Sequence, residues 1–589
     1  MKDFVKMVLA TIVGLILLSF VSLFFFGAFA GAVAALGSGE QVIPVEGMLE
    51  IDMATIVLGE QDKEQDPLAA IQAGEQAPET VGILKAANAI RVAAEDPGVK
   101  FIYMKPDMTV GGTAHIDELR AALVDFRACG KPIVSYLETP TNAGYYLASV
   151  SDKIYMSSYD GTMNMLTGVS SQLIFLKDLL DRLGINVQLI RHGKYKSAGE
   201  MFIRNSSSKE NLEQNQAMVN SIWGSWASKM AEARGLTTDQ FNSLLDELKL
   251  NSAKDFLDNG LVDELVTREQ MQDKLAALYM TDKFSKVLSI PFAGYAKAKF
   301  TTDYKKKNKV AVIYADGEIV DGKAKKQVAG DRFADIIADV RKDSTIKAVV
   351  LRVNSPGGSV VASSKIKTEL DLLRESVPVI ASYGNYAASG GYWISANCDK
   401  IFSNATTLTG SIGVFSMIPD VSGALKNKLH VNVTTVNSNA HSDLYSLIKP
   451  LDAAETAYMQ ASVENIYERF TSIVAEGRDM TVEAVDAIAQ GRVWTGATAK
   501  ELGLVDELGG LDKALEIAAQ KAEVDAYSII RYPSQDSFFS SLLNEGKDDY
   551  INGKIQEVLG ESYSYIKFIE NLKDQDRIQA RMPFDLRIQ

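Results

Sequence analysis

The sequence has little of the two side chains on which most metal sites and disulfide frameworks depend. Its 589 residues include only two cysteines and four histidines. Cys129 and Cys398 cannot supply a disulfide framework or a Cys-x-x-Cys metal site. Four histidines leave little material for a histidine zinc site or for a histidine-based catalytic triad. No metal or organic cofactor is therefore indicated.

The chain also lacks an excess of positive charge. Its 61 basic and 75 acidic residues give a net charge of −14, so a nucleic-acid partner is not expected. Hydrophobic residues make up 47% and charged residues 23%, a composition that excludes disordered and collagen-like proteins. At roughly 150 residues per domain, the length predicts about three or four structural units.

Charged residues are absent altogether from Met7 to Gly39, a segment dominated by apolar side chains. A membrane-spanning helix needs about 20 apolar residues, whereas the core of a secretory signal has about 7–15. We therefore expect an uncleaved anchor, although Ala32–Ala34 resembles a signal cleavage site. Lys2 and Lys6 precede the segment and acidic residues follow it. The positive-inside rule places the N-terminus in the cytoplasm and the rest of the chain outside the inner membrane, as a single-pass protein.

An internal repeat organises the rest of the sequence. Shifted by about 247 residues, Gly144–Leu147 aligns with Gly391–Ile394, and Asp152–Tyr155 aligns with Asp399–Phe402. Such self-similarity predicts two tandem copies of one domain. The expected units are a cytoplasmic tail and anchor over 1–39, a first domain over 40–283, a linker over 284–308, a second domain over 309–525 and a C-terminal extension over 526–589.

Each copy alternates short apolar segments of strand length with longer amphipathic segments of helical spacing. The predicted strands are Phe101–Met104, Pro132–Tyr136 and Lys153–Met156 in the first copy, and Ala348–Val353, Val377–Ser382 and Lys400–Ser403 in the second. The predicted helices include Glu210–Arg234, Ala334–Arg341, Ser364–Leu373 and Asp452–Glu476. This alternation predicts an α/β fold with parallel strands and crossover helices.

Two glycine-rich segments of the second copy follow successive predicted strands. Asn354–Ser359 follows the first of them, and Gly384–Trp393, which contains Ser389, follows the next. Taken alone, the first segment fits a strand-to-helix turn, and Ser389 fits a helix N-cap as well as a nucleophile. The carboxyl ends of parallel strands meet at one edge of a sheet. Together the segments predict an acyl-transfer site, with the Ser389 hydroxyl as nucleophile and the N–H groups of Gly358 and Gly390 as an oxyanion hole.

A serine nucleophile needs a base, and no histidine lies in either segment. A desolvated lysine can serve, because burial disfavours the charged form and lowers the pKa of the amine. The first copy offers Lys194 and Lys196 directly after the predicted strand Val187–Ile190. Composition does not distinguish these two lysines, and most lysines are solvated surface groups.

Four segments together resemble the signal peptide peptidase A family in its long, duplicated bacterial form. They are Tyr195–Ala198, Asn354–Ser359, Ala387–Trp393 and Leu408–Gly413. The likeness spans almost the whole chain, including the anchor and the repeat. It implies the α/β fold shared by Clp protease and crotonase. It also implies a membrane-anchored homo-tetramer that digests signal peptides and other hydrophobic peptides.

Carried over to the matching positions, the resemblance implies a Ser/Lys dyad. Ser389 takes the place of the nucleophile, and Lys196 takes that of the general base. Ser411 matches a family serine that hydrogen-bonds the lysine. Gly358 and Gly390 take the oxyanion-hole places.

Neither copy contains a complete site. Ser389 aligns with Asn142 of the first copy, so the first copy lacks the nucleophile. Lys196 aligns with the segment Asn439–Asp443 of the second copy, which has no lysine. An active site must therefore form where a first copy meets a second copy, either within one chain or between neighbouring chains.

Two other functions remain open. A membrane-tethered crotonase-type acyl-CoA enzyme would share the oxyanion segments but needs no serine–lysine dyad. A non-catalytic scaffold for membrane partners would need no catalytic site. The first copy retains Lys196 and the second retains Ser389, and this retention of both members of the dyad argues against a scaffold. Labelling of Ser389 by a fluorophosphonate probe would favour the peptidase, whereas tight CoA binding without labelling would favour the acyl-CoA enzyme.

Overall fold

The computed structural model describes residues 43–63, 78–161, 163–300, 306–325, 327–534 and 578–582. The anchor predicted over 1–39 lies outside these residues. Among the helices of the described ranges, none has the length and apolar character needed to cross a membrane.

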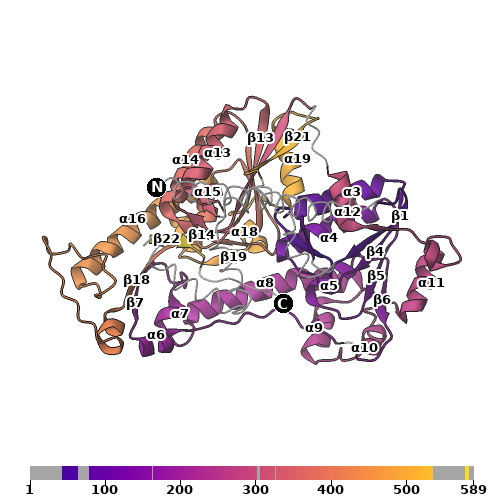
Figure 1. Cartoon of the computed structure of the whole chain (residues 1–589), viewed down its shortest axis with the longest axis horizontal. Coiled ribbons are helices and arrows are strands. Elements are labelled where there is room, and N and C mark those ends of the chain that lie inside the picture. The colour runs from indigo at the N-terminus through magenta and orange to yellow at the C-terminus, as the bar shows by residue number, and fades with distance from the viewer. Residues whose placement is uncertain are drawn as a thin grey trace, which may run out of the picture.

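The two copies build sheets with the same strand order, which confirms an α/β fold made of two repeats (Figure 1). In the first copy the order is β8 (Glu264–Val266), β6 (Lys153–Ser157), β5 (Ile133–Leu137), β4 (Val99–Lys105), β1 (Gly47–Asp52) and β9 (Ser289–Pro291). In the second it is β20 (Glu507–Leu508), β16 (Lys400–Ser403), β15 (Val379–Ala388), β13 (Ile346–Ser355), β10 (Lys309–Asp316) and β21 (Ser528–Tyr532). All these neighbours pair in parallel.

Helices connect and cover these strands, as parallel pairing requires. The first copy contains α3 (Ile83–Glu95), α4 (Thr113–Arg127), α5 (Asn142–Ala148), α6 (Lys177–Leu183), α7 (Glu200–Ile203), α8 (Lys209–Ala233), α9 (Thr238–Asp246), α10 (Ala253–Asp258), α11 (Arg268–Leu278) and α12 (Phe292–Lys299). The second contains α13 (Gly330–Lys342), α14 (Val360–Arg374), α15 (Gly390–Ser395), α16 (Ala453–Arg478), α17 (Val482–Ile488), α18 (Gly496–Glu501) and α19 (Leu511–Lys521).

The repeat extends to individual hydrogen bonds. The buried Tyr145 hydroxyl donates to the carbonyl oxygen of Leu261 at 2.7 Å. Its counterpart Tyr392 donates to the carbonyl oxygen of Leu504 at 2.8 Å. Tyr145 lies on α5, which follows β5, and Tyr392 lies on α15, which follows β15, so the same tertiary contact is built twice.

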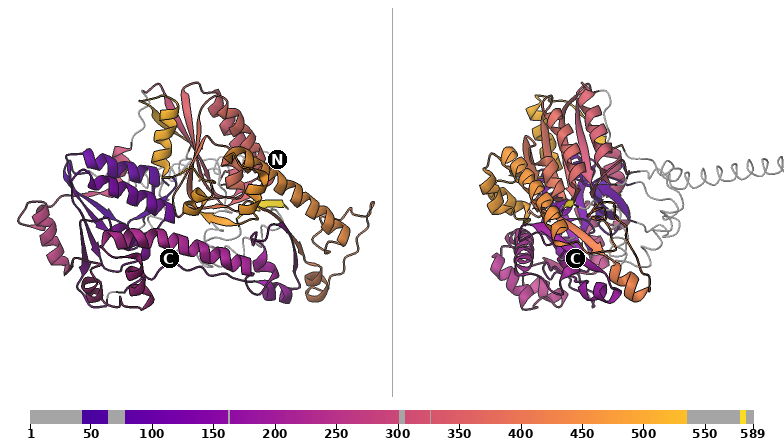
Figure 2. Two further views of the ribbon diagram at one scale, coloured as in Figure 1. Left: turned by 180° about the vertical axis from the view of Figure 1, so that it is seen from behind. Right: turned by 90° about the vertical axis from the view of Figure 1, so that its left-hand side faces the viewer.

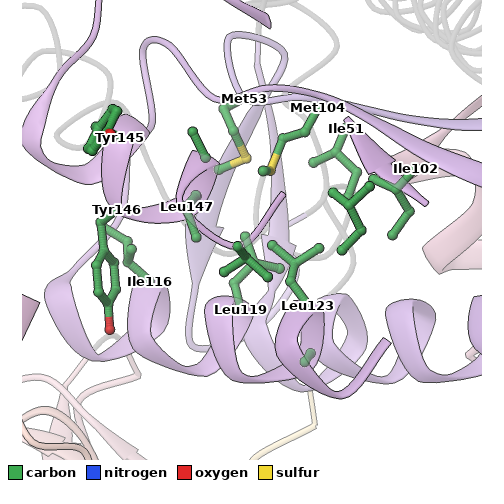
Figure 3. Packing of buried hydrophobic residues seen from close by; sticks show 14 of the residues in the cluster. Ile51, Met53, Ile102, Met104, Ile116, Leu119, Leu123, Tyr145, Tyr146 and Leu147 are labelled. Atoms are coloured by element: carbon green, nitrogen blue, oxygen red, sulfur yellow. The ribbon is translucent and has the colours of Figure 1, made fainter. Parts of the chain in front are cut away.

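The core of each copy lies between its sheet and its helices. In the first copy, Ile51 of β1 and Met104 of β4 face Leu119 and Leu123 of α4, and all four side chains are fully buried (Figure 3). Burying such a side chain contributes about 1.5–3 kcal/mol relative to leaving it in water. The near-continuous apolar segments in the sequence arise because both faces of a parallel sheet are covered.

The sheets extend beyond the domain limits expected from the sequence. The predicted linker 284–308 contains β9, which pairs with β1, and α12, which packs on the first copy. The predicted C-terminal extension contains β21, which pairs with β10 of the second copy. Each copy therefore ends with an edge strand that the apolar pattern did not reveal.

Two segments expected as loops are strands. β15 continues through Gly384–Ala388 because its second half pairs with β17 (Leu408–Gly410). Gly357–Ser359 forms β14 instead of a turn, because it pairs with β11 (Ile319–Val320) and with β22 (Ile578–Arg581). These strands depend on partners far away in the sequence, so local composition could not indicate them.

The remaining strands are short or join distant parts of the chain. They are β2 (Ile56–Gly59), β3 (Glu79–Gly82), β7 (Asn186–His192), β12 (Val328–Ala329), β18 (Val414–Asp420) and β19 (Val493–Thr495). β2 pairs with β3 in the first copy, as β11 pairs with β12 in the second.

Candidate active site

A strand of the first copy carries Lys196 into the second copy. β7 pairs antiparallel with β18 of the second copy along its whole length, from Asn186 opposite Asp420 to His192 opposite Val414. Helix α8 then runs from this junction along the base of the second copy back to the first (Figures 1 and 2). The two copies are thus linked by a continuous ladder directly before Lys196.

Lys196 and Ser389 meet within one chain. The Nζ atom of Lys196 lies 2.9 Å from Ser389 Oγ, and it also donates to the Oγ and the carbonyl oxygen of Ser411, each at 2.9 Å. All three residues are completely buried. Lys194, the other lysine that the sequence left open, is exposed. The structure therefore brings together three of the five predicted site residues around one amine.

Burial lowers the pKa of the Lys196 amine well below its ordinary value. Among the described residues, no carboxylate forms an ion pair with it that would oppose this shift. Desolvation penalises the charged form of a lysine, so the neutral amine is favoured. A neutral amine hydrogen-bonded to a serine hydroxyl has the properties of a general base.

Ser389 occupies a strained turn between β15 and α15. Its backbone angles are φ 54° and ψ −114°, a region that residues other than glycine seldom adopt. Its N–H donates to the carbonyl oxygen of Gly410 at 2.8 Å, which holds this conformation. Ser389 stands at the N-cap position of α15, but its side chain makes no capping hydrogen bond to the helix. The hydroxyl is directed to Lys196 instead.

The predicted oxyanion glycines lie beside Ser389. Gly358 has φ 151°, and a Cβ atom there would lie 1.9 Å from the carbonyl oxygen of Ile319. A Cβ atom on the preceding Gly357 would lie 2.7 Å from the N atom of Gly390. Only glycine allows these two backbone segments to approach so closely. The structure therefore places Gly358 and Gly390 with the other three predicted site residues.

A family model now connects this geometry to known proteins. The model for peptidase family S49 matches residues 125–281 and 371–525, one region in each copy. The chain belongs to peptidase family S49. Lys196 lies in the first matched region, and Ser389 and Ser411 lie in the second.

Relatives of known name extend the match over most of the S49 chain. Protease 4 of Haemophilus influenzae is 34% identical over 500 residues, 82% of this chain and 80% of that protein. Serine protease SPPA, chloroplastic, of Arabidopsis thaliana is 29% identical over 500 residues, 83% of this chain and 72% of that protein. A protein of Enterococcus faecium named as a candidate signal peptide peptidase SppA is 36% identical over 219 residues, 37% of this chain and 63% of that protein. The chain is a serine protease.

The S49 protease holds Lys196 in place with residues that the sequence analysis missed. Arg191 donates to the carbonyl oxygen of Lys196 at 2.6 Å, and the buried Glu200 pairs with Arg191 at 3.3 Å. Gly491 of the second copy packs against the lysine backbone, where a Cβ atom would lie 2.5 Å from Lys196 Cβ. No sequence signal links Gly491 to Lys196, because nearly 300 positions separate them and their contact depends on the docking of the two copies.

Replacing Gly491 with alanine is expected to lower kcat on the order of 100-fold, because displacement of a catalytic group by about 1 Å has effects of that size. Gly503→Ala is a matched control. Gly503 has φ 76°, against 77° for Gly491, but its nearest neighbour would be Met480 Cε at 3.9 Å. Both variants carry the same left-handed strain of about 1–2 kcal/mol. Equal kcat values for the two variants, measured with one peptide substrate, would contradict the positioning role.

The first copy has a structural residue where the second has Ser389. The Asn142 side chain donates to the carbonyl oxygen of Gly168 at 2.9 Å and accepts from the N–H groups of Thr167 and Gly168 at 3.1 and 3.0 Å. These bonds tie down the segment after β6. In the first copy, the position that aligns with Ser389 therefore holds a residue that stabilises the structure.

The aromatic residues after Ser389 do not line a groove together. Tyr392 is completely buried and Trp393 is 2% exposed, with its ring 4.8 Å from that of Phe470. Both side chains belong to the core of the second copy, where Tyr392 packs against Tyr383 and Trp393 against α16. Tyr386 is partly buried and packs beside Ala388 at the end of β15.

A buried ion cluster fixes the two copies relative to each other. Arg352 of β13 is completely buried and donates to Glu60 at 2.7 Å and to Glu118 at 2.8 Å, both in the first copy. His115 lies 2.8 Å from Glu60. Burial alone would raise the pKa of the Glu60 carboxyl, but Arg352 and His115 lower it, with a net result of about 2. Asn385 of β15 accepts a further hydrogen bond from the N–H of Ala114 at 3.0 Å.

Proposed function

We propose that this S49 protease is a membrane-anchored endopeptidase that degrades cleaved signal peptides with a dyad of Ser389 and Lys196. One observation carries the proposal: the 2.9 Å contact between the Lys196 amine and the Ser389 hydroxyl in a completely buried environment. Burial of this amine costs folding free energy, and buried groups with shifted pKa values are concentrated at functional sites.

In the proposed mechanism, the neutral Lys196 amine takes the proton of Ser389 as the oxygen attacks a peptide carbonyl. The N–H groups of Gly358 and Gly390 stabilise the resulting oxyanion. The protonated amine then donates its proton to the leaving peptide nitrogen, which leaves an ester on Ser389. Water, activated by the same amine, hydrolyses the ester. Ser411, which accepts two hydrogen bonds from Lys196, holds the amine in position.

The dyad forms between the two copies of one chain in this proposal, since the contact joins Lys196 and Ser389 of a single chain. The expected assembly, a homo-tetramer, is part of the proposal and rests on the family resemblance. It would place several complete sites in one particle without requiring a neighbour to complete any of them. Light scattering on the purified protein gives the number of chains in the particle.

Two further parts of the proposal concern location and substrate. The charge-free segment Met7–Gly39 would anchor the chain in the inner membrane, with a cytoplasmic N-terminus and the catalytic copies on the other side. A relative named as a candidate signal peptide peptidase supports signal peptides and other hydrophobic peptides as substrates. An exported site would also lack CoA, which disfavours the acyl-CoA enzyme.

A fluorophosphonate probe tests the reaction class directly. We expect covalent labelling at Ser389, identified by mass spectrometry of the labelled peptide, because the reagent captures an activated serine oxygen. Ser389→Ala should abolish labelling and peptide cleavage while the protein keeps its fold by circular dichroism. Tight CoA binding without labelling would reject the peptidase in favour of the acyl-CoA enzyme. If the protein showed neither labelling nor CoA binding, the scaffold would be favoured.

A further inference from the structure

One buried amide, that of Gln214 on α8, joins the segment that carries Lys196 to a strand of the second copy. Its nitrogen donates to the carbonyl oxygen of Tyr195 at 3.1 Å and to the hydroxyl of Ser197 at 2.9 Å. Its oxygen accepts from the N–H of Val493 in β19 at 3.3 Å. Gln214 is only 1% exposed. The amide is therefore held from both copies, although it takes no direct part in the proposed proton transfers.

The orientation of this amide is fixed by its partners. A backbone carbonyl only accepts a hydrogen bond and a backbone N–H only donates one, so the amide nitrogen faces Tyr195 and the oxygen faces Val493. An apolar side chain of the same size would satisfy neither group. The position therefore requires an amide of this length.

The segment around Lys196 depends on such support because it has no regular secondary structure. Lys196 and Ser197 lie between β7 and α7, outside any helix or strand. Buried backbone groups without a ladder partner must be satisfied in another way. Arg191 donates to the carbonyl oxygen of Lys196, and Gln214 donates to that of Tyr195. Without Gln214, the buried carbonyl group directly before Lys196 would lose this donor.

The buried face of α8 changes from polar to apolar along the helix. Toward the C-terminus it consists of the apolar residues Met218, Ile222 and Trp226, at the spacing expected of an amphipathic helix. At its start it consists of the buried polar residues Asn211, Gln214 and Asn215. The polar part lies beside the lysine segment, where the Ser197 hydroxyl donates to Asn211 Oδ1 at 2.9 Å. Departures from the expected pattern of this kind are concentrated at functional sites.

The connection continues from Val493 to both serines of the site. Val493 is opposite Gly410 in the pairing of β19 with β17, and the carbonyl oxygen of Gly410 accepts from the N–H of Ser389 at 2.8 Å. The carbonyl oxygen of the preceding residue, Arg492, accepts from the N–H of Ser411 at 2.7 Å. A single side chain thus joins the backbone of the base to the strands that hold the nucleophile.

We propose that Gln214 is a positioning residue of this protease, which holds the Lys196 amine against Ser389 by fastening the lysine segment to β19. It acts through the backbone and not on the reacting atoms. Because Gln214 is buried away from the substrate, its loss affects kcat more than KM. This inference rests on the proposed function of Ser389 and Lys196.

Replacing Gln214 with methionine tests the proposal, because methionine has a similar length and no amide. We expect kcat for an internally quenched peptide to fall on the order of 10- to 100-fold, with KM within about two-fold of wild type. The pH at which a fluorophosphonate labels Ser389 at half of its maximal rate should also rise, because a displaced amine is more exposed to water.

This shift in pH reports on Lys196, because the charged groups beside the lysine segment form pairs that the substitution leaves in place. They are Arg191 with Glu200 and Arg492 with Glu213. If Gln214→Met does not fold, Gln214→Asn is the milder variant. It keeps an amide, but it is one methylene too short to reach from the lysine segment to Val493, so kcat and the half-maximal pH should change in the same directions.

Asn215→Leu is the matched control. Asn215 is also a buried amide of α8, and it donates to Oδ1 and to the carbonyl oxygen of Asn211 at 2.9 and 2.8 Å. Among the described residues, no hydrogen bond joins it to Tyr195, Lys196 or Ser197. Its replacement should lower stability but leave kcat and the half-maximal pH of labelling close to those of wild type.

Two results would overturn the inference. One is a folded Gln214 variant with the kcat and the half-maximal pH of wild type, and the other is an equal fall in kcat in Asn215→Leu, which would show a merely structural role. Failure of the proposed function would give a different result, because the wild type itself would neither cleave the peptide nor react with the fluorophosphonate.

Discussion

Replacing Lys196 with methionine is expected to abolish peptide cleavage and to raise the midpoint temperature of unfolding at pH 7. Loss of the base from a serine protease typically lowers kcat on the order of 10⁴-fold or more. Stability should increase because burial lowers the pKa of this amine. At neutral pH the folded state therefore carries the free-energy cost of burying this amine, and methionine removes that cost.

The pH dependence of this gain follows from the same linkage. Between its lowered pKa in the folded chain and the ordinary value of 10.5, Lys196 is protonated in the unfolded chain and neutral in the folded one. The folded state is therefore penalised at low pH, and the penalty fades as the pH rises toward 10.5. The midpoint temperatures of unfolding of the wild type and of Lys196→Met should therefore converge as the pH rises toward 10.5. The exposed Lys194→Met provides the control, with unchanged kcat and an unfolding free energy within about 0.5 kcal/mol of wild type.

Replacing Arg352 with methionine is expected to destabilise the protein by about 3–5 kcal/mol, because Glu60 and Glu118 would remain buried without a cation. The guanidinium joins the second copy to both carboxylates of the first. Its loss should therefore also disturb the alignment of Lys196 with Ser389 and lower kcat. Urea denaturation monitored by circular dichroism measures the first effect, and cleavage of a peptide measures the second.

Arg374→Met is the matched control for this variant. Arg374 also pairs with a carboxylate, Asp399 at 3.1 Å, but the pair is within the second copy and its side chains are 31% and 25% exposed. An exposed ion pair of this kind contributes about 0–1 kcal/mol. Equal losses of stability in the two variants would show that the buried cluster does not hold the copies together.

Much of the fold could be predicted from the sequence because the signals were local. The apolar strands Phe101–Met104 and Ala348–Val353 lie within β4 and β13, and the long helices at 210–234 and 452–476 correspond to α8 and α16. The repeat was visible because equivalent residues, such as Tyr145 and Tyr392, make equivalent contacts.

The features that the sequence did not reveal depend on contacts between distant segments. Composition could not distinguish Lys196 from Lys194, because burial of the former depends on the second copy. Gly384–Ala388 looked like a loop, yet it pairs with β17. The short segment Ile578–Arg581 carries no strand signal of its own, and it is a strand only because β14 and β18 present their edges to it.

The pH dependence of Ser389 labelling by a fluorophosphonate tests most directly whether an uncharged Lys196 activates the serine. The rate should rise with pH as the amine loses its proton, and reach half of its maximum well below the ordinary lysine value of 10.5. Lys196→Arg, which stays charged, should label only at the background rate. A half-maximal rate near pH 10.5, or unchanged labelling in Lys196→Arg, would contradict the account.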